Sequence, residues 1–129
     1  MPQHGTFVWN ELHTRDVERA KRFYGEALGW TYDAMPMPDG SGTYWVAKAG
    51  DAFAGGIFSI ADPRFDGMPE HWLSYIETDD VDARVAKAKA AGGQIHREPW
   101  DIPGVGRIAI LGDAGGAGLG FMTSAPRQA

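Results

Sequence analysis

One segment constrains the fold of this chain more than any other. Between residues 6 and 30 a strand, a tight turn and an amphipathic helix follow one another without a break. β-Branched and aromatic residues alternate before Asp16, and apolar residues then recur at helical spacing as far as Leu28. Asp16 suits the helix N-cap, where its carboxylate can accept from free backbone amides, and Gly29 suits the position just past the helix end. We therefore predict a helix that packs back onto the preceding strand.

The same pattern returns in the second half of the chain. An alternating segment, an aspartate and a helix ending in glycines occur again, and Asp80 follows Asp16 by 64 residues (80 − 16). At this offset Leu12 corresponds to Ile76, so each should face its own helix. A duplication of about half the chain indicates two copies of one supersecondary unit. A solenoid would need three or more short repeats.

The remaining segments complete two βαβββ units joined by a polar connection that contains prolines. Alternating patterns predict further strands, and segments rich in glycine and proline predict the turns between them. We predict an α+β fold and one domain of two modules, at about residues 6–60 and 71–123. Helices are expected at 16–28 and 81–91, and strands at 6–13, 30–35, 43–47, 53–60, 71–78, 94–98, 106–111 and 119–123.

Composition excludes several classes of protein. The net charge of −5 argues against nucleic acid or an anionic membrane as a partner. The chain has no cysteine, which excludes disulfides, thiolate catalysis and zinc–thiolate sites. No segment has the length and apolar character of a membrane span or a signal peptide, so a cytoplasmic protein is expected.

The helix sequence D-V-E-R-A-K-R-F-Y-G-E-A-L-G-W, residues 16–30, resembles the first helix of the vicinal oxygen chelate superfamily. That superfamily includes glyoxalases, bleomycin resistance proteins and extradiol dioxygenases. Motifs that resemble its single-domain glyoxalase-like branch are W-x-E-L at 9–12, W-L-x-Y at 72–75, D-D-V-D at 79–82, D-I-P-G-V-G-R at 101–107 and G-D-A-G-G-A at 112–117. The resemblance covers nearly the whole chain. It implies the glyoxalase/bleomycin resistance fold, in which two βαβββ units form a curved, cup-like mixed sheet around a largely apolar cleft.

The resemblance also allows the metal ligands of the superfamily to be checked by position. Metal-dependent members carry a histidine on the first strand of each unit, before the helix-capping aspartate, and a glutamate on the last strand. The corresponding residues here are Trp9, Leu73, Gly120 and, at the repeat offset, Gly56, with Ile57 if the register differs by one. None of these side chains can bind a divalent ion. We expect no metal at these positions and no cofactor.

A displaced metal site is the alternative. Glu11 and His71 lie two residues from the lost ligand positions and on the same strand faces, so together they could recruit an ion if their strands face each other. The simpler interpretation places His71 at a strand entry and His13 at a strand exit, with His4 and His96 on the surface.

The cup is expected to hold a small molecule against aromatic side chains and one carboxylate, Glu11. The alternatives are that Glu11 makes a structural hydrogen bond and that the aromatic residues are a filled core. Arg107 could reach a ligand carboxylate, or it could tie its loop to Asp101. The expected ligand-binding residues are Trp9, Glu11, Tyr44, Trp45, His71, Leu73, Tyr75, Arg107 and Met122, with only one of Tyr44 and Trp45 facing inward.

Two functions follow from this interpretation. The first is a binding protein that holds an aromatic or amphipathic small molecule in the cup. The second is a metal-independent lyase or isomerase with Glu11 as general acid or base and Tyr75 or Arg107 as the electrophilic partner. A metal-dependent glyoxalase or dioxygenase is disfavoured by the missing ligands. We also predict a homodimer, because exposed sheet edges and apolar surface near Trp72 and Trp100 favour pairing of chains.

Overall fold

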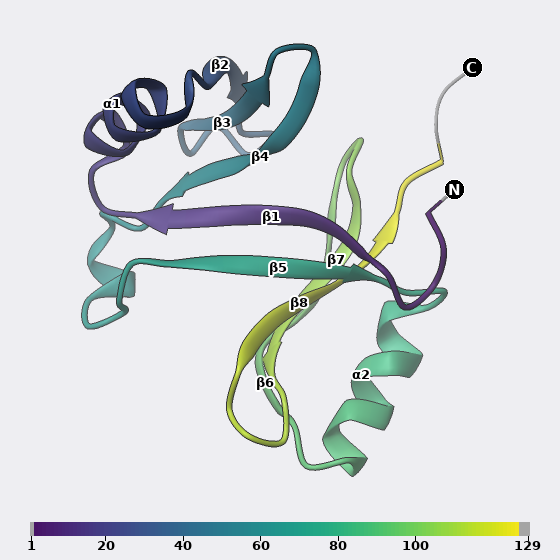
Figure 1. Cartoon of the computed structure of the whole chain (residues 1–129). Coiled ribbons are helices and arrows are strands. Elements are labelled where there is room, and N and C mark those ends of the chain that lie inside the picture. The colour runs from purple at the N-terminus through teal and green to yellow at the C-terminus, as the bar shows by residue number, and fades with distance from the viewer. Residues whose placement is uncertain (1, 127–129) are drawn as a thin grey trace. The chain divides into compact units, whose positions relative to one another are not determined.

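The computed structural model describes residues 2–126, and these form an α+β fold (Figure 1). Its helices are α1 (Val17–Leu28) and α2 (Val81–Ala90), with a short 3-10 helix, η1 (Pro63–Phe65). Its strands are β1 (Phe7–Thr14), β2 (Thr31–Pro36), β3 (Thr43–Ala49), β4 (Ala52–Ser59), β5 (His71–Glu77), β6 (Gln94–Ile102), β7 (Gly106–Gly112) and β8 (Gly118–Ser124). The predicted order of two βαβββ modules is confirmed.

The chain forms two compact units, which we call the first and the second unit. The first unit is Asn10–Leu73 and contains α1. The second unit contains α2 and consists of the residues from Ser74 on, together with those up to Trp9. Strand β1 therefore begins in the second unit, where the backbone N–H of Glu77 donates to the carbonyl oxygen of Thr6 at 2.8 Å.

The sheet of the first unit has the strand order β2-β3-β4-β1. Strands β1 and β4 are parallel, and the other neighbouring pairs are antiparallel. Helix α1 covers one face of this sheet, where Leu12 and Ile57 pack against Ala20 in a buried cluster (Figure 1). The alternation of β1 thus turns Leu12 towards the helix, as predicted, and turns its neighbours Glu11 and His13 to the opposite face.

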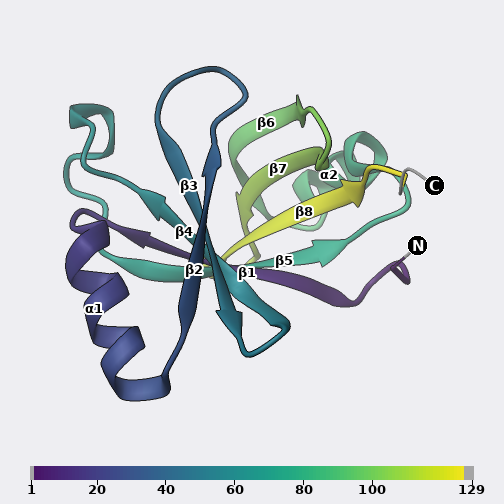
Figure 2. The ribbon, with the colours of Figure 1, turned by 90° about the horizontal axis from the view of Figure 1, so that it is seen from above.

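The sheet of the second unit has the order β5-β8-β7-β6, and Figure 2 shows β6, β7 and β8 running side by side. Strands β5 and β8 are parallel, whereas β7 is antiparallel to both of its neighbours. Helix α2 contributes Val81 and Val85 to a buried cluster with Ala109 of β7. Each unit therefore consists of one helix packed on one face of a four-stranded mixed sheet.

Strand register confirms the 64-residue repeat residue by residue. Glu11 pairs with Gly56 in the first unit, and Tyr75 pairs with Gly120 in the second, so both members of the pair are displaced by the same offset. The helix caps repeat as well. The Asp16 carboxylate accepts from the backbone N–H of Arg19 at 3.0 Å, and the Asp80 carboxylate accepts from that of Ala83 at 3.1 Å.

Most element ends agree with the sequence predictions to within two residues, and two segments differ by more. Strand β6 continues to Ile102, well past residue 98, because two register shifts against β7 let it pass Pro99 without ending the pairing. The connection between the modules includes η1, whose capping residue Asp62 accepts from the backbone N–H of Arg64. Within residues 2–126, no helix has the length and apolar character needed to cross a membrane.

Candidate functional site

Glu11 and His13 form a buried polar pair on the face of the first sheet that lies opposite α1. The two residues share this face because they are two positions apart on β1. His13 Nε2 lies 2.7 Å from Glu11 Oε2, and Glu11 and His13 are only 9% and 7% exposed. A buried carboxylate held by an imidazole can bind a polar ligand group or transfer a proton.

The other ring nitrogen of His13, Nδ1, is a buried polar atom that a ligand could bond. Nδ1 is buried and has no hydrogen-bond partner among residues 2–126. Because Nε2 is the ring nitrogen that faces the Glu11 carboxylate, Nδ1 is the nitrogen that a ligand could hydrogen-bond. The ring is packed between Phe58 and His71, with centroid distances of 5.5 and 4.8 Å. His71 is itself held by its Nδ1, which lies 2.8 Å from the carbonyl oxygen of Pro69.

Tyr44 approaches the same face from β3. Val46 pairs with Gly56, which pairs with Glu11, and Tyr44 is two residues before Val46, so all four positions share one face. The Tyr44 hydroxyl lies directly over Gly56, where a Cβ atom would overlap it. Gly56 thus makes room for a phenol beside the position of Glu11. We call Glu11, His13, Tyr44 and His71 the polar face.

The second unit carries a related arrangement with different chemistry. Tyr75 occupies the position of Glu11, and its ring lies over Gly120, where a Cβ would overlap ring atoms. Met122 and Glu77 share this face with Tyr75. Glu77 occupies the position that corresponds to His13. Its carboxylate accepts from the backbone N–H of Ser124 at 2.9 Å and from the Ser124 hydroxyl.

Two of the expected ligand-binding residues, Trp45 and Arg107, lie on the helix-covered faces. Trp45 packs against the buried cluster under α1, with Lys21 Nζ 3.4 Å above its ring, so only Tyr44 of the two candidates shares the face of Glu11. Arg107 faces α2, where its guanidinium donates to both carboxylate oxygens of Asp82 at 2.7 and 3.1 Å. The predicted tie to Asp101 is also present, at 3.2 Å.

These ion pairs make Arg107 a structural residue of the second unit. Hydrogen bonds from Arg107 lower the pKa of the Asp82 carboxyl. In return, the hydrogen bonds to Asp82 and Asp101 raise the pKa of the Arg107 guanidinium above its usual value. The Arg107 guanidinium is therefore held by charge-assisted hydrogen bonds to two carboxylates, and a ligand carboxylate would have to displace one of them. Trp9 is half-buried and Leu73 is buried, and their contact with a ligand stays a prediction.

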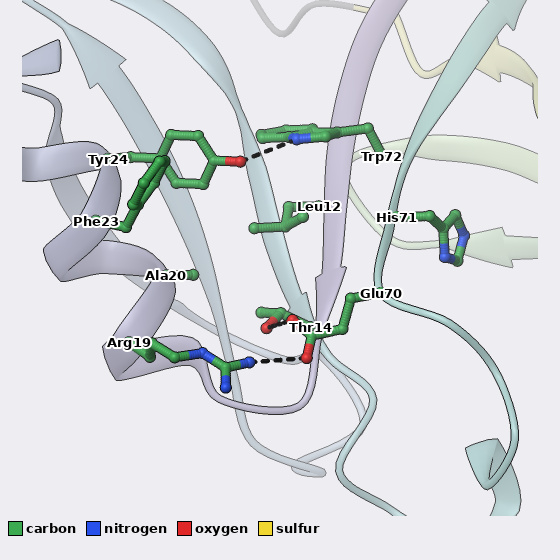
Figure 3. Close-up of a pocket in the computed structure, with 9 residues that line it drawn as sticks. All are labelled: Leu12, Thr14, Arg19, Ala20, Phe23, Tyr24, Glu70, His71 and Trp72. Atoms are coloured by element: carbon green, nitrogen blue, oxygen red, sulfur yellow. Dashed lines mark hydrogen bonds and ion pairs between the residues drawn. The ribbon is translucent and has the colours of Figure 1, made fainter. Parts of the chain in front are cut away.

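A groove of about 370 Å³ lies on the α1 side of the first unit, between α1 and the beginning of β5 (Figure 3). One end is aromatic and contains Phe23, Tyr24 and Trp72. At the other end Glu70 accepts from the Thr14 hydroxyl at 2.5 Å and from Arg19 Nη2 at 2.8 Å. The hydrogen bond from Thr14, together with Arg19, lowers the pKa of Glu70 and keeps it ionised.

Comparison with known proteins identifies the family. A model of the Glyoxalase/Bleomycin resistance protein/Dioxygenase superfamily matches residues 6–121. The chain belongs to this superfamily. It is 46% identical over 124 residues to "Putative glyoxylase CFP32" of Mycobacterium tuberculosis (strain CDC 1551 / Oshkosh), a match that covers 96% of this chain and 46% of that protein. It is 30% identical over 123 residues to "Anthracycline biosynthesis protein DnrV" of Streptomyces peucetius, covering 88% of this chain and 45% of that protein.

This superfamily member spans about half the length of the curated relatives it matches. Solved structures share its fold at low identity. The methylmalonyl-CoA epimerase from Mycobacterium tuberculosis superposes with a TM-score of 0.66 at 17% identity, covering 95% of this chain and 89% of the epimerase. The hypothetical protein BH1468 from Bacillus halodurans C-125 gives a TM-score of 0.70 at 16% identity, covering 98% and 99%. At such identities the likeness shows the fold alone.

The positions that the superfamily resemblance assigns to metal ligands do not fit a divalent ion. Trp9 and Leu73 have no donor atom for a metal. Gly56 and Gly120 have no side chain, and tyrosines lie over both of them, so the space that a ligand carboxylate would use is filled. In the described part of the chain, no group of three or more histidine, aspartate or glutamate side chains could hold a metal ion. The displaced site on Glu11 and His71 stays a prediction.

Sequence reasoning singled out Glu11 but assigned His13 to a strand exit. The structure does place His13 at the end of β1, but it also buries this residue and bonds it to Glu11. One signal was available, because residues two apart on a strand share a face and Glu11 and His13 were therefore neighbours. Burial of the pair could not be read from that spacing.

Proposed function

We propose that this superfamily member binds a small organic molecule on the polar face without a divalent metal at the superfamily positions. The observation that carries the proposal is the buried Glu11–His13 hydrogen bond of 2.7 Å beside Tyr44. Burying a carboxylate and an imidazole is costly unless the groups are paired, and a few polar groups in a largely apolar site are what fixes the orientation of a bound small molecule.

The chemistry of the polar face indicates an aromatic or amphipathic ligand with a polar group. Tyr44 and His71 are half-buried and offer flat rings, while Glu11 and His13 are buried on the same face as hydrogen-bonding groups. The names of the relatives, a glyoxylase and an anthracycline biosynthesis protein, agree with a role in the chemistry of small organic molecules.

The test is native mass spectrometry of protein purified without chelator, combined with metal analysis after dialysis. We expect a retained small molecule and no stoichiometric nickel, zinc or iron. Glu11→Gln and Tyr44→Phe should reduce retention, whereas Trp45→Phe, on the α1 face, should leave it unchanged. Retention that is equal in all three variants would contradict the proposal. A stoichiometric metal ion would contradict its metal-independent part.

A metal-independent lyase or isomerase is the second candidate, and the same hydrogen bond favours it. An imidazole oriented by a carboxylate is a competent acid–base pair, and His13 Nδ1 is unpartnered among residues 2–126. In such an enzyme the pair would remove a proton from a carbon atom of the ligand and later return one.

Incubation in D₂O separates the two candidates. An enzyme would leave deuterium from solvent on a carbon atom of the retained molecule, and mass spectrometry of the released ligand would detect it. Glu11→Gln should then abolish exchange while affinity changes by less than about tenfold, because only the transition state needs the proton transfer. Absence of exchange in the wild-type protein would leave binding as the function.

A further inference from the structure

The groove beside α1, which we call the α1 groove, is separate from the polar face. It includes Leu12 and Trp72, whereas Glu11, the neighbour of Leu12 on β1, projects to the other side of the strand. His71 borders the groove and also contacts the His13 ring, so it is the one residue that the groove shares with the polar face. In Figure 3 the side chains of His71 and Trp72 extend in opposite directions from β5, and Trp72 reaches towards Tyr24. Nothing assigned to the polar face accounts for the aromatic residues gathered here.

The aromatic end of the α1 groove is held in place by its own contacts. The Tyr24 ring stacks on Trp30 at 5.1 Å and meets Trp72 edge-on at 5.6 Å, and Trp72 Nε1–H donates to the Tyr24 hydroxyl at 3.1 Å. Phe23 contacts Tyr24 at 4.9 Å but is 61% exposed, and Trp72 is 40% exposed. These aromatic rings are held in place but remain partly exposed to solvent. They therefore form a preorganised surface on which another flat ring could pack.

The polar end of the α1 groove offers donors rather than acceptors. Both oxygens of Glu70 already accept, one from Thr14 and one from Arg19. The Arg19 side chain is 59% exposed, and within the described residues its guanidinium pairs with Glu70 through one of its five N–H groups. The remaining donors can bind an oxygen anion, and their planar arrangement suits a carboxylate.

The internal repeat supplies a comparison within the same molecule. The second unit has an equivalent groove of about 420 Å³ beside α2, and it includes Lys87 and Ala88. At the 64-residue offset these positions correspond to Phe23 and Tyr24. The groove beside α2 includes Phe121 but has no aromatic residue at these two helix positions, so the rings of Phe23 and Tyr24 are a property of this sequence and not a requirement of the architecture.

We propose that the α1 groove binds a planar aromatic carboxylate, with its ring against Phe23 and Trp72 and its carboxylate on Arg19. The groove volume of about 370 Å³ is at the small end of the range for ligand sites and suits a molecule of one or two rings. A cationic ligand is disfavoured because it would meet the positive charge of Arg19, whereas an anion can accept from the N–H groups of Arg19 that Glu70 does not use. The site is independent of the function proposed for the polar face.

The test uses 2-naphthoate as the probe and ¹H–¹⁵N NMR of the whole chain as the readout. We expect a dissociation constant at or below about 1 mM for a molecule of this size. The Trp72 indole N–H and the amides of α1 should shift on binding. The cationic analogue 2-naphthylmethylammonium should bind at least about tenfold more weakly, because it loses the charge-assisted bonds to Arg19 and meets its positive charge.

Matched variants locate the contact. Arg19→Gln and Phe23→Ala should each weaken 2-naphthoate binding by about five- to tenfold. Their controls are Arg22→Gln, on an exposed position of the same helix, and Phe53→Ala, a ring that is 70% exposed elsewhere in the first unit. Both controls should stay within about twofold of the wild type.

Three results would overturn the proposal. The first is equal affinity for the anionic and the cationic probe. The second is binding that Arg19→Gln leaves unchanged while the spectrum shows a folded protein. The third is failure of the probe to bind while Phe23→Ala lowers the molecular mass in light scattering, which would make the groove a contact between two copies of the chain.

Discussion

Gly120→Ala tests whether the Tyr75 ring occupies the space of a missing side chain. The φ angle of Gly120 is not positive, so alanine can adopt this backbone without strain. Its Cβ, however, would overlap Cδ1 and Cε1 of the Tyr75 ring and lie 3.1 Å from Cγ. Tyr75 is only 5% exposed, so the ring cannot swing into water and must displace its neighbours.

Two opposing effects set the size of the change in the free energy of unfolding. Forcing extra atoms into a packed site costs about 1–3 kcal/mol, and contact near the base of a ring places this case in the upper part of that range. Replacing glycine by alanine within a strand returns about 0.5–1 kcal/mol. We expect a net loss of about 1–2.5 kcal/mol, or about 4–10 °C in Tm for a chain of this size.

Urea unfolding followed by tryptophan fluorescence measures this loss, and a double-mutant cycle identifies its cause. With Tyr75→Leu in place the new methyl group has room, so Gly120→Ala should then cost about 1–2 kcal/mol less than in the wild type. Gly56→Ala is the matched control, because it meets the movable tip of Tyr44 and should cost less. If Gly120→Ala is as stable as the wild type, or if the two changes are additive, the ring does not occupy this space.

The remaining predictions concern assembly, capping and pH. Light scattering at micromolar concentration should give twice the chain mass of 14.0 kDa, and a single-chain mass would refute the homodimer. Asp16→Ala removes the acceptor for the Arg19 amide and should cost about 1 kcal/mol in urea unfolding, so an unchanged midpoint would show that the cap is unimportant. Hydrogen bonding from Arg84 lowers the pKa of Asp79 to about 2. Because this folded-state pKa lies below the usual aspartate value of 3.8, the stabilisation is present above about pH 4 and is lost as the pH falls towards 2. In a carboxyl NMR titration, Arg84→Gln should move the midpoint up towards 3.8, and an unmoved midpoint would exclude Arg84 as the cause.

Much of the fold was predictable because its signals are local. Asp16 and Asp80 mark helix starts through hydrogen bonds to amides three residues away, and the alternation around Leu12 indicates which strand face meets the helix. The 64-residue offset could be read from the sequence, and the pairing of Glu11 with Gly56 and of Tyr75 with Gly120 follows it.

The candidate site was predictable only in part, because a face can be assigned from alternation only when the register of neighbouring strands is known. Tyr44 and Trp45 are adjacent aromatic residues on β3, and the pairing of Val46 with Gly56 decides that Tyr44 joins Glu11. The sequence left open whether Arg107 binds a ligand. In the structure it pairs with Asp82, which is 25 residues away, and no local pattern indicates that contact.

The sequence by itself determined the order of the elements, the caps, the duplication and the absence of donor atoms at the positions assigned to metal ligands. These depend on residue types and on spacings within a few positions. Only the tertiary structure decided that His13 is buried against Glu11, that tyrosines lie over Gly56 and Gly120, and that a groove lined by Phe23 and Trp72 remains open. The physical reason is that burial, ring packing and hydrogen-bond partners are set by segments far apart in the chain, whose approach no local pattern specifies.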